Sequence, residues 1–438
     1  MPDNTRFLAG AAREDVTPKV GTCLYGYVPN HHSESVHDGL NVTALALESE
    51  STKALVITAE VGNIQNALCD ELRAEISAKT SVPFENIVIS CTHTHSAPNL
   101  TGSEGWGEVD REYYDEIFAP GAILAAEKAC SAVAPCEVAI GVTESLVGIN
   151  RRQQHFDGSI GLGQNPHGCY DPNMTVVIFR NSETKAGILN LIHYSCHGTS
   201  AGRNVEITRD WSGVMIDRLE CESGTLTAFF NGACGDVGPR LSNGSTCGDI
   251  HHVEEMGGLA AADAMRAYKA RGGFHEGKLE VFVDTLHLPY AALPTLGEVK
   301  EKLKAYPDPE NIVNLARMEY THWKEVEEFL ESGKTETPEP FTFPQTLISI
   351  GDVLFVPYAY ELFSEIQMRL REYSPYPYTL CMTNANGTLC YLPSEDQLCR
   401  GGYEVGCFKV GRLFPLAPNT DQNLLNETFR ILRENGKV

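Results

Sequence analysis

The sequence predicts an α/β (or α+β) protein that forms a single large domain over residues 1–438, with a mixed central sheet flanked by helices. Apolar segments that suit buried strands alternate with segments of helical spacing through the first 240 residues, and strand signals return between residues 346 and 382. The chain shows no internal repeat and no long linker, so one compact unit is the simplest organisation. A hydrophobic content of 42% and a charged content of 21% are ordinary for a protein with a full core.

A strand, a helix and a second strand are predicted in succession near the N-terminus. Residues 53–59 (KALVITA) form a short apolar, β-branched run that suits a buried strand. Apolar residues between 61 and 76 recur at spacings of three and four, which indicates an amphipathic helix. Residues 86–91 (NIVISC) are the second strand. This order is that of a crossover unit, which joins two parallel strands through a helix.

The remaining elements follow from the same patterns. Strands are predicted at 174–179, 187–192, 226–230, 346–356 and 379–382, and helices near 212–219, near 252–268 and from about residue 361. Gly351 and Asp352 form a hairpin turn within the fourth of these strands. Residues 296–334 are rich in Glu and Lys at helical spacing, which indicates a helical excursion on the surface, such as a helical hairpin, rather than a second catalytic domain.

The charge and the apolar patterning exclude several classes of partner. The net charge of -24, from 58 acidic and 34 basic residues, argues against binding nucleic acid or an anionic membrane. Residues 1–8 lack the basic start and apolar run of a secretion signal. No stretch approaches the roughly 18 consecutive apolar residues of a transmembrane segment. We therefore expect a cytoplasmic protein; its oligomeric state cannot be read from the sequence.

The fourteen cysteines are scattered from Cys23 to Cys407 and include no CxxC pair. A disulfide scaffold is typical of short secreted chains, and a structural zinc site usually shows paired cysteines. We therefore expect most of these cysteines to be reduced, buried side chains that pack as small hydrophobic residues.

Polar loop segments follow several predicted strands, and function in α/β folds gathers at such strand ends. The segment THTHSAP at 92–98 carries His93 and His95. Residues two apart in extended chain face the same way, so both imidazoles can point into one site. Neutral imidazole is a preferred zinc ligand, so the pair indicates a metal site. Two surface histidines in a loop would give the same local pattern.

Two further loops follow predicted strands. HYSCHGTS at 193–200 carries His197 before small residues that permit close approach, although a lone histidine at such a place is commonly a structural residue. Asp210 is a candidate N-cap of the helix that follows. NGACGDVGP at 231–239, with Asp236 and Gly238, could present backbone amides to a developing oxyanion, but an ordinary tight turn would look the same.

Two C-terminal segments carry further candidate residues. PYAYE at 357–361 places Glu361 at a predicted helix start, where a first-turn charge is the common role. Tyr391 follows a turn-rich segment, and Tyr403 lies in RGGYE. Tyrosines near turns are usually packing residues with a hydrogen-bonded hydroxyl.

In this order, the segments resemble the N-terminal catalytic domain of the neutral/alkaline (non-lysosomal) ceramidase family. The matching motifs span residues 9 to about 405 and are AGAAREDVTP, THTHSAP, NRR at 150–152, CHGTS, GDVGP, PxxxE, CYLPS and GGYE. The resemblance implies a catalytic zinc ion held by two histidines, a glutamate and a tyrosine, which match His93, His197, Glu361 and Tyr391. It also implies that three residues contact the substrate and the reacting carbonyl: His95, Arg151 and Tyr403.

One position departs from the family pattern. Characterised ceramidases carry GDVSP in this loop and use its serine as the nucleophile, whereas this chain has Gly238 there. The resemblance further predicts a ceramidase-like protein that lacks the C-terminal immunoglobulin-like domain of full-length enzymes.

We therefore expect a zinc-dependent hydrolase (an amidohydrolase) that cleaves an amide or related acyl bond of a soluble acylated small molecule by metal-activated water. His95 would transfer protons, and Arg151 and Tyr403 would stabilise the oxyanion. Two alternatives stay open. One is a true ceramidase with another nucleophile, for which Cys234 and Ser242 lie nearby in sequence. The other is an inactive metal- or ligand-binding protein that has kept the fold.

Overall fold

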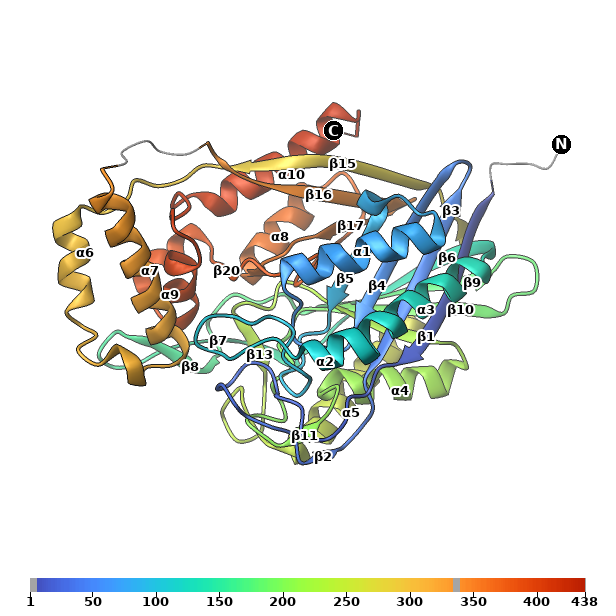
Figure 1. Ribbon diagram of the computed structural model, residues 1–438. Coiled ribbons are helices and arrows are strands. Elements are labelled where there is room, and N and C mark those ends of the chain that lie inside the picture. Colours follow the sequence, from blue (N-terminus) through green and yellow to red (C-terminus); the bar gives the residue numbers. More distant parts are fainter. Residues whose placement is uncertain (1–5, 334–338, 438) are drawn as a thin grey trace.

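The computed structural model describes residues 6–333 and 339–437. Four layers follow one another: helices, a nine-stranded sheet, a four-stranded sheet and a second set of helices (Figure 1). This arrangement confirms the predicted α/β class with a mixed central sheet flanked by helices. Residues 1–5, which belong to the segment predicted to carry no secretion signal, and Lys334, the last residue of the predicted helical excursion, lie outside the described residues.

The nine-stranded sheet has the order β12-β10-β9-β6-β1-β3-β4-β5, with β14 beside β6. Its strands are β1 (Phe7–Asp15), β3 (Asn41–Ser49), β4 (Thr52–Ala59), β5 (Ile87–Cys91), β6 (Ala134–Glu144), β9 (Asn173–Asn181), β10 (Gly187–Tyr194), β12 (Thr227–Asn231) and β14 (His275–Glu276). The pairs β4–β5 and β10–β12 are parallel, and the other pairs are antiparallel. Helix α1 (Asn66–Thr80) joins β4 to β5, which confirms the predicted crossover unit.

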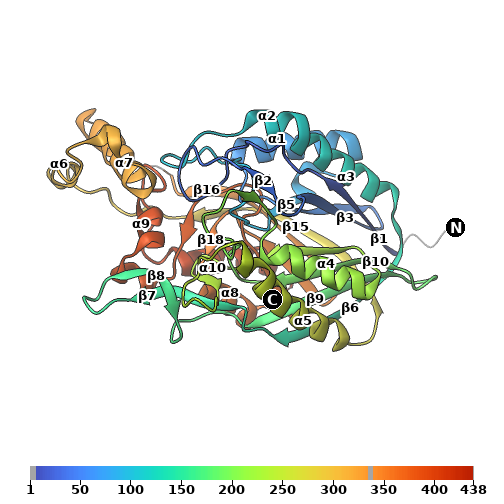
Figure 2. The ribbon, with the colours of Figure 1, turned by 90° about the horizontal axis from the view of Figure 1, so that it is seen from below.

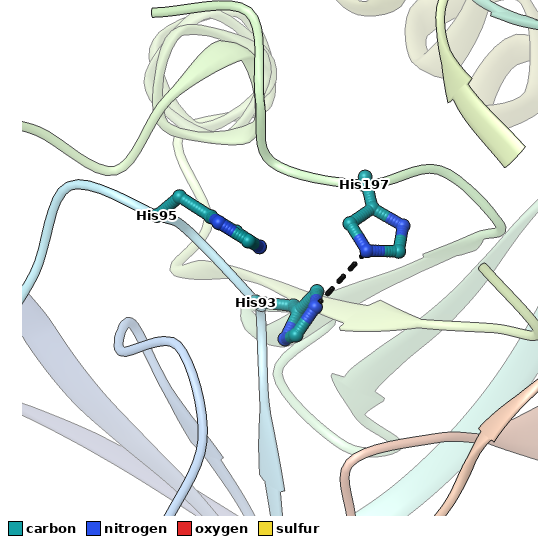
Figure 3. A group of neighbouring side chains, drawn as sticks. All are labelled: His93, His95 and His197. Atoms are coloured by element: carbon teal, nitrogen blue, oxygen red, sulfur yellow. Dashed lines mark hydrogen bonds between the residues drawn. The ribbon is translucent and has the colours of Figure 1, made fainter. Parts of the chain in front are cut away.

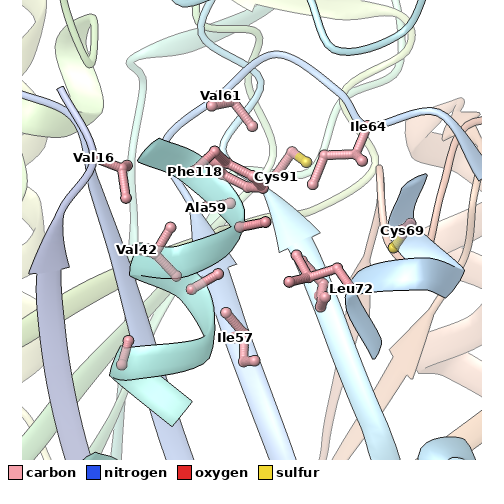
Figure 4. Packing of buried hydrophobic residues seen from close by; sticks show 14 of the residues in the cluster. Val16, Val42, Ile57, Ala59, Val61, Ile64, Cys69, Leu72, Cys91 and Phe118 are labelled. Atoms are coloured by element: carbon pink, nitrogen blue, oxygen red, sulfur yellow. The ribbon is translucent and has the colours of Figure 1, made fainter. Parts of the chain in front are cut away.

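Alternate side chains of these strands enter different cores, as the twofold period of a strand requires. On β4, Leu55 and Ile57 pack beneath the helices, whereas Val56 points to the opposite face. Figure 4 shows the helix-side core around Ile57, Leu72 and Phe118. The helices that cover this face are α1, α3 (Ala119–Ser131), α4 (Trp211–Ser223) and α5 (Ile250–Lys269).

The four-stranded sheet packs on the opposite face of the nine-stranded sheet. Its strands, in spatial order, are β15 (Leu279–Leu288), β16 (Phe341–Ile350), β17 (Val353–Pro357) and β19 (Tyr378–Met382). The predicted hairpin turn at Gly351 and Asp352 joins β16 to β17, and Gly351 has φ +57°. The outer face of this sheet is covered by α8 (Ser364–Tyr373) and α10 (Thr420–Glu434) (Figure 1).

The two edge strands of the nine-stranded sheet, β5 and β12, come close together. The Thr58 hydroxyl on β4 donates to the Phe229 carbonyl on β12 at 2.7 Å. The segment after β19 closes the remaining gap, because the Thr383 amide donates to Asn231 at 3.0 Å and the Cys91 amide donates to Asn384 at 3.0 Å. The loops that follow β5 and β12, the two edge strands of the sheet, therefore lie close together.

Two predicted helix starts are wrong. Glu361 lies on the short strand β18 (Glu361–Leu362), which pairs in parallel with β20 (Tyr391–Leu392), and α8 begins only at Ser364. The pairing partner is remote in sequence, so local spacing could not show it. Helix α1 begins at Asn66, whereas Val61 and Ile64 lie in the preceding loop. Both are buried in the same core as the helix, and this burial mimics helical spacing (Figure 4).

Smaller elements extend from the layered core. The strands β13 (Val237–Pro239), β7 (Gly148–Gln154) and β8 (Ile160–Asn165) form a three-stranded sheet. Within the range 296–334 lie α6 (Leu296–Leu303) and α7 (Asn314–Glu331). Both views place this helical pair at one end of the molecule, with α7 beside α9 (Tyr403–Val410) (Figures 1 and 2).

All fourteen cysteines are free thiols: seven are buried, four are half-buried and three are exposed. The expected burial holds for only half of the cysteines. No helix among residues 6–333 and 339–437 combines the length and the apolar character that a membrane crossing needs.

Replacing Gly141 with alanine should destabilise the fold. A β-carbon at Gly141 on β6 would lie 1.9 Å from the Ala267 carbonyl oxygen of α5, so the helix must shift away from the sheet. We expect a loss of about 1–3 kcal/mol in the free energy of unfolding, measured by urea denaturation. Gly297→Ala is the control, because a β-carbon at Gly297 would have no neighbour within 4 Å. Equal stability of the two variants would contradict this packing.

Candidate active site

Two histidine-bearing loops meet at the carboxyl ends of β5 and β10. The side chain of Asn231 joins them, donating to the Thr92 carbonyl at 3.1 Å and to the Cys196 carbonyl at 2.9 Å. Gly198 permits their close approach, since a β-carbon there would lie 2.7 Å from the His93 carbonyl oxygen. His93 itself has φ +68°, an unfavourable conformation for a non-glycine residue that the surrounding contacts must hold in place.

Three side-chain atoms converge between these loops. His93 Nε2 and His197 Nε2 lie 3.2 Å apart, and Glu361 Oε2 lies 3.3 Å from the first and 3.2 Å from the second. Four ligands around a zinc ion at ordinary bond lengths stand about 3.3 Å from one another. The three atoms are therefore spaced as ligands of one metal ion would be.

The hydrogen bond at Nδ1 of each imidazole fixes the protonation state of the Nε2 atom that faces the site. His93 Nδ1 lies 2.8 Å from the Gly62 carbonyl, and His197 Nδ1 lies 2.6 Å from the Cys234 carbonyl. A carbonyl oxygen only accepts, so each Nδ1 must carry the proton and each neutral ring must present a bare lone pair at Nε2. Two nitrogen lone pairs and a carboxylate oxygen thus face one another in a buried space, where only a positive charge between them removes the repulsion.

Burial also sets the protonation of this group. It lowers the pKa of His197 to about 3, and Arg151 acts in the same direction. Burial alone would raise the pKa of Glu361, but His93 and His197 oppose it and hold that pKa well below its usual range. At neutral pH the histidine is therefore uncharged and the glutamate ionised, which are the forms that bind a metal.

Glu361 and Tyr391 are direct partners in the parallel β18–β20 ladder. Tyr391 is 6% exposed, and its hydroxyl accepts a hydrogen bond from Arg151 Nη2 at 3.1 Å. Arg151 is held from behind by Glu404, whose carboxylate accepts from Arg151 Nε at 3.0 Å and from Arg152 Nη1 at 2.6 Å. The structure thus brings the predicted glutamate, tyrosine and arginine together, with Glu404 as the residue that positions Arg151.

His95 lies beside the converging group (Figure 3). Its ring centroid is 5.0 Å from that of His93, and both ring nitrogens are buried without a hydrogen-bond partner among the described residues. One nitrogen from each of His93, His95 and His197 lies within 4.8 Å of the other two, so these three residues could also hold a metal ion. Burial, followed by His93, holds the pKa of His95 well below its usual value, so this ring is also neutral.

Two tyrosines enclose His95. The ring centroids of Tyr25 and Tyr27 lie 5.1 and 5.3 Å from the centroid of His95. Gly26 between them has φ +103°, and a β-carbon there would lie 2.2 Å from His95 Nδ1. The backbone of Gly26 therefore lies so close to the imidazole that a side chain at this position would not fit.

Thr246 fills the space beside Gly238. A β-carbon at Gly238 would lie 2.7 Å from the β-carbon of Thr246, which is 2% exposed. The backbone carbonyl of Thr246 accepts a hydrogen bond from the Thr199 hydroxyl at 2.8 Å, which ties its segment to the His197 loop. The Thr246 side chain therefore occupies the space that a side chain at position 238 would need. A serine at this position would have to displace Thr246.

The loop before Gly238 supports the fold around the site. Asp236 accepts from the Ser364 amide at 2.7 Å and from Asn150 at 3.1 Å. The backbone amides of four loop residues already donate within the protein: Gly232, Ala233, Gly235 and Val237. The suggestion that this loop offers amides to an oxyanion is therefore wrong for these four groups, because β10, α8 and β18 accept from the first three and the Cys234 carbonyl of the same loop accepts from Val237.

The two other candidate nucleophiles are poorly placed for that role. Ser242 is exposed, and its hydroxyl donates to Glu255 at 2.9 Å. Cys234 is fully buried, and burial raises the pKa of its thiol far above the ordinary value. A reactive thiol needs the opposite shift.

A cavity of about 470 Å³ opens onto the site. The residues at its inner end are Tyr25, Gly26, His95, Glu361, Tyr391 and Tyr403. Trp106 lies against Tyr403, with ring centroids 6.4 Å apart. The opposite wall comes from α7, so the helical excursion borders the site. The volume lies in the range of small-molecule sites.

Sequence patterns did not single out several residues of this site: Tyr25, Tyr27, Trp106, Thr246 and Glu404. The glycine between two tyrosines in the YGY segment at 25–27 is a weak local signal of close approach. Glu404 lies in the GGYE motif but was given no role there, whereas Trp106 and Thr246 come from segments without a motif that indicates metal binding or catalysis.

A double-mutant cycle tests the match between Gly238 and Thr246. Gly238→Ser should destabilise the protein by about 1–3 kcal/mol, because the new side chain overlaps Thr246. Thr246→Gly removes the obstructing atoms, so the double variant should recover at least about 1 kcal/mol relative to the sum of the single changes. Urea denaturation of all four proteins measures this coupling. Simple additivity would show that the two positions do not share one space.

Comparisons with known proteins identify the family of this chain. The family model of the neutral/alkaline non-lysosomal ceramidase, N-terminal, matches residues 7–285. The structure of neutral ceramidase from Pseudomonas aeruginosa superposes with a TM-score of 0.75 at 19% identity, covering 99% of this chain and 75% of the other. A structure titled "Ceramidase complexed with C2" gives a TM-score of 0.74 at 18% identity, covering 98% and 76%. No curated protein sequence matches. The family model covers more than half of the chain, and the chain therefore belongs to the neutral/alkaline non-lysosomal ceramidase family.

Proposed function

We propose that this protein is a zinc-dependent amidohydrolase in which His93, His197, Glu361 and Tyr391 hold the metal and water replaces the family serine as nucleophile. Membership of the ceramidase family supports an amide hydrolase. The observation that carries the zinc assignment is the convergence of two Nε2 lone pairs and one carboxylate oxygen at 3.2–3.3 Å. When bound, zinc lowers the pKa of a bound water toward about 7 and polarises a carbonyl group.

The ligand set is proposed over the three-histidine alternative for a physical reason. Glu361 Oε2 has no conventional hydrogen-bond donor and completes the tight triangle with His93 and His197. A site of two histidines and one glutamate has an overall charge of +1 with Zn²⁺, whereas three neutral histidines leave the full charge of the ion. The smaller net charge costs less free energy to bury. This choice leaves both nitrogens of His95 available to the substrate and to a transferred proton.

The other residues bind and orient the substrate. The guanidinium of Arg151 is fixed by Glu404 and faces the Tyr391 hydroxyl, so it can stabilise negative charge that develops on the carbonyl oxygen. Tyr403 lines the same end of the cavity. His95 is the proposed proton carrier, because it is neutral and neither nitrogen has a hydrogen-bond partner in the described part of the chain.

The nucleophile follows from Gly238 and Thr246. Gly238 has no side chain to attack a carbonyl, and Thr246 occupies the adjoining space. We therefore propose direct attack of water on the amide carbonyl, without an acyl-enzyme. A soluble acylated small molecule is the proposed substrate, and the cavity of about 470 Å³ supports a compact ligand.

Removing His93 tests the metal assignment. His93→Ala should lose stoichiometric zinc, measured by mass spectrometry of the metal, and should lower kcat/KM on a panel of amides more than about 100-fold. His167→Ala is the matched control, because His167 is exposed. A His93→Ala protein that keeps both stoichiometric zinc and full activity would show that the site is assigned wrongly.

Weakening the support of Arg151 should separate metal binding from catalysis. Glu404→Gln removes the charge that fixes Arg151, so we expect kcat to fall about 10- to 100-fold while zinc content stays stoichiometric. The buried ion pair also contributes to stability, so the unfolding temperature is measured in parallel. The control is Glu395→Gln, at an exposed carboxylate. Unchanged kcat in a folded, zinc-loaded Glu404→Gln protein would exclude a role for this support.

A further inference from the structure

The outer wall of the cavity is one face of α7. Met318, Thr321, His322 and Glu325 line it, and their spacing of three, four and seven residues places them on the same side of the helix. Facing them are Arg412, which follows α9, and residues 388–390 before β20. The cavity therefore has a polar outer end that is distinct from the converging histidines and Glu361.

Arg412 is the single Arg or Lys among the described residues that line this cavity. It forms no ion pair with any residue of the described ranges, although the protein carries a large excess of acidic side chains. Its Nη2 donates to the Tyr360 hydroxyl at 3.1 Å and to the Leu389 carbonyl at 3.4 Å. The guanidinium also lies 4.7 Å from the ring centroid of Phe341. The charge is thus held in position while its other N–H groups have no partner in the described part of the chain.

His322 provides a second polar group at this end. It is 4% exposed, and its Nδ1 is buried with no hydrogen-bond partner among the described residues. Burial lowers the pKa of His322 to about 4, so the ring is neutral at physiological pH. A buried nitrogen without a partner is costly unless a ligand or water satisfies it.

The acidic groups at the rim do not neutralise Arg412. Glu104 is bound to Arg317 at 2.7 Å and to the Thr321 hydroxyl at 3.1 Å. Glu325 is exposed, where water and salt screen its charge. Arg412 therefore remains the uncompensated charge of the half-buried outer end.

We propose that this outer end binds a carboxylate of the substrate. The amide to be cleaved would then lie at the histidines, and the carboxylate at the end of one arm of the molecule would bind Arg412 beside His322. The inference rests on the proposed amide hydrolysis and narrows its substrate class to acylated molecules that carry a terminal carboxylate. The planar guanidinium suits a carboxylate because it donates two parallel hydrogen bonds to the two oxygens.

Matched pairs of ligands test the proposal. The carboxylates are adipic acid monoanilide and N-acetyl-6-aminohexanoate, which place the charge on the acyl arm and on the amine arm respectively. Each is compared with its terminal primary amide, which has the same shape without the charge. Binding is measured by calorimetry, and hydrolysis by release of the amine.

At least one of the two carboxylates should bind at least about tenfold more tightly than its neutral counterpart, or be hydrolysed with a kcat/KM at least about tenfold higher. Arg412→Gln should abolish this preference, so that the charged and the neutral ligand of each pair give similar values. Arg433→Gln, the control at an exposed arginine of α10, should keep it. An absent preference in the unmodified protein, or one that survives Arg412→Gln, would overturn the proposal.

His93→Ala separates this proposal from the proposed function. That variant should lose zinc and turnover but keep the binding preference for the carboxylate, because Arg412 and His322 remain. If the preference disappears with the metal, the carboxylate binds at the metal centre and the assignment of Arg412 is wrong. Amide hydrolysis without any charge preference would retain the proposed function and reject this inference alone.

Discussion

The site depends on one electrostatic constraint: two imidazole lone pairs and a carboxylate oxygen are held 3.2–3.3 Å apart in a buried space. Such a group is repulsive by itself, because the Nδ1 protons of His93 and His197 are committed to backbone carbonyl groups. The fold must therefore hold the three atoms together, and a cation bound between them would supply the compensating attraction. The strained backbone of His93 and the close contact at Gly198 are the local means by which the fold does so.

The sheet supplies the larger part of this constraint. His93 follows β5 and the Gly238 loop follows β12, and these strands are the two edges of the nine-stranded sheet. They meet because the segment after β19 hydrogen-bonds to both edges. The same C-terminal region provides Glu361 and Tyr391 on β18 and β20. The residues proposed to hold the metal therefore come from loops of the nine-stranded sheet and from the separate two-stranded sheet of β18 and β20.

Gly238 and Thr246 connect the fold to the chemistry. Within a family whose characterised members carry serine in the GDVSP loop, the exchange to glycine leaves no void here, because Thr246 packs into the adjoining space. The proposal of water as the nucleophile rests on this packing, because Gly238 has no side chain and Thr246 leaves no room for one. The proposed carboxylate at the outer end of the cavity rests on Arg412, which has no ion-pair partner within the described residues.

The sequence by itself determined the class of fold, the crossover unit, the hairpin at Gly351 and the family, because periodicity and motifs are properties of neighbouring residues. It also supplied the chemical types at the site, with the histidine, glutamate and tyrosine motifs in the family's order. Only the tertiary structure decided how they combine. Glu361 lies on a two-residue strand rather than a helix because its partner Tyr391 is thirty residues away. Thr246 and Arg412 lie beside the site through contacts between remote segments, for which a one-dimensional pattern carries no signal.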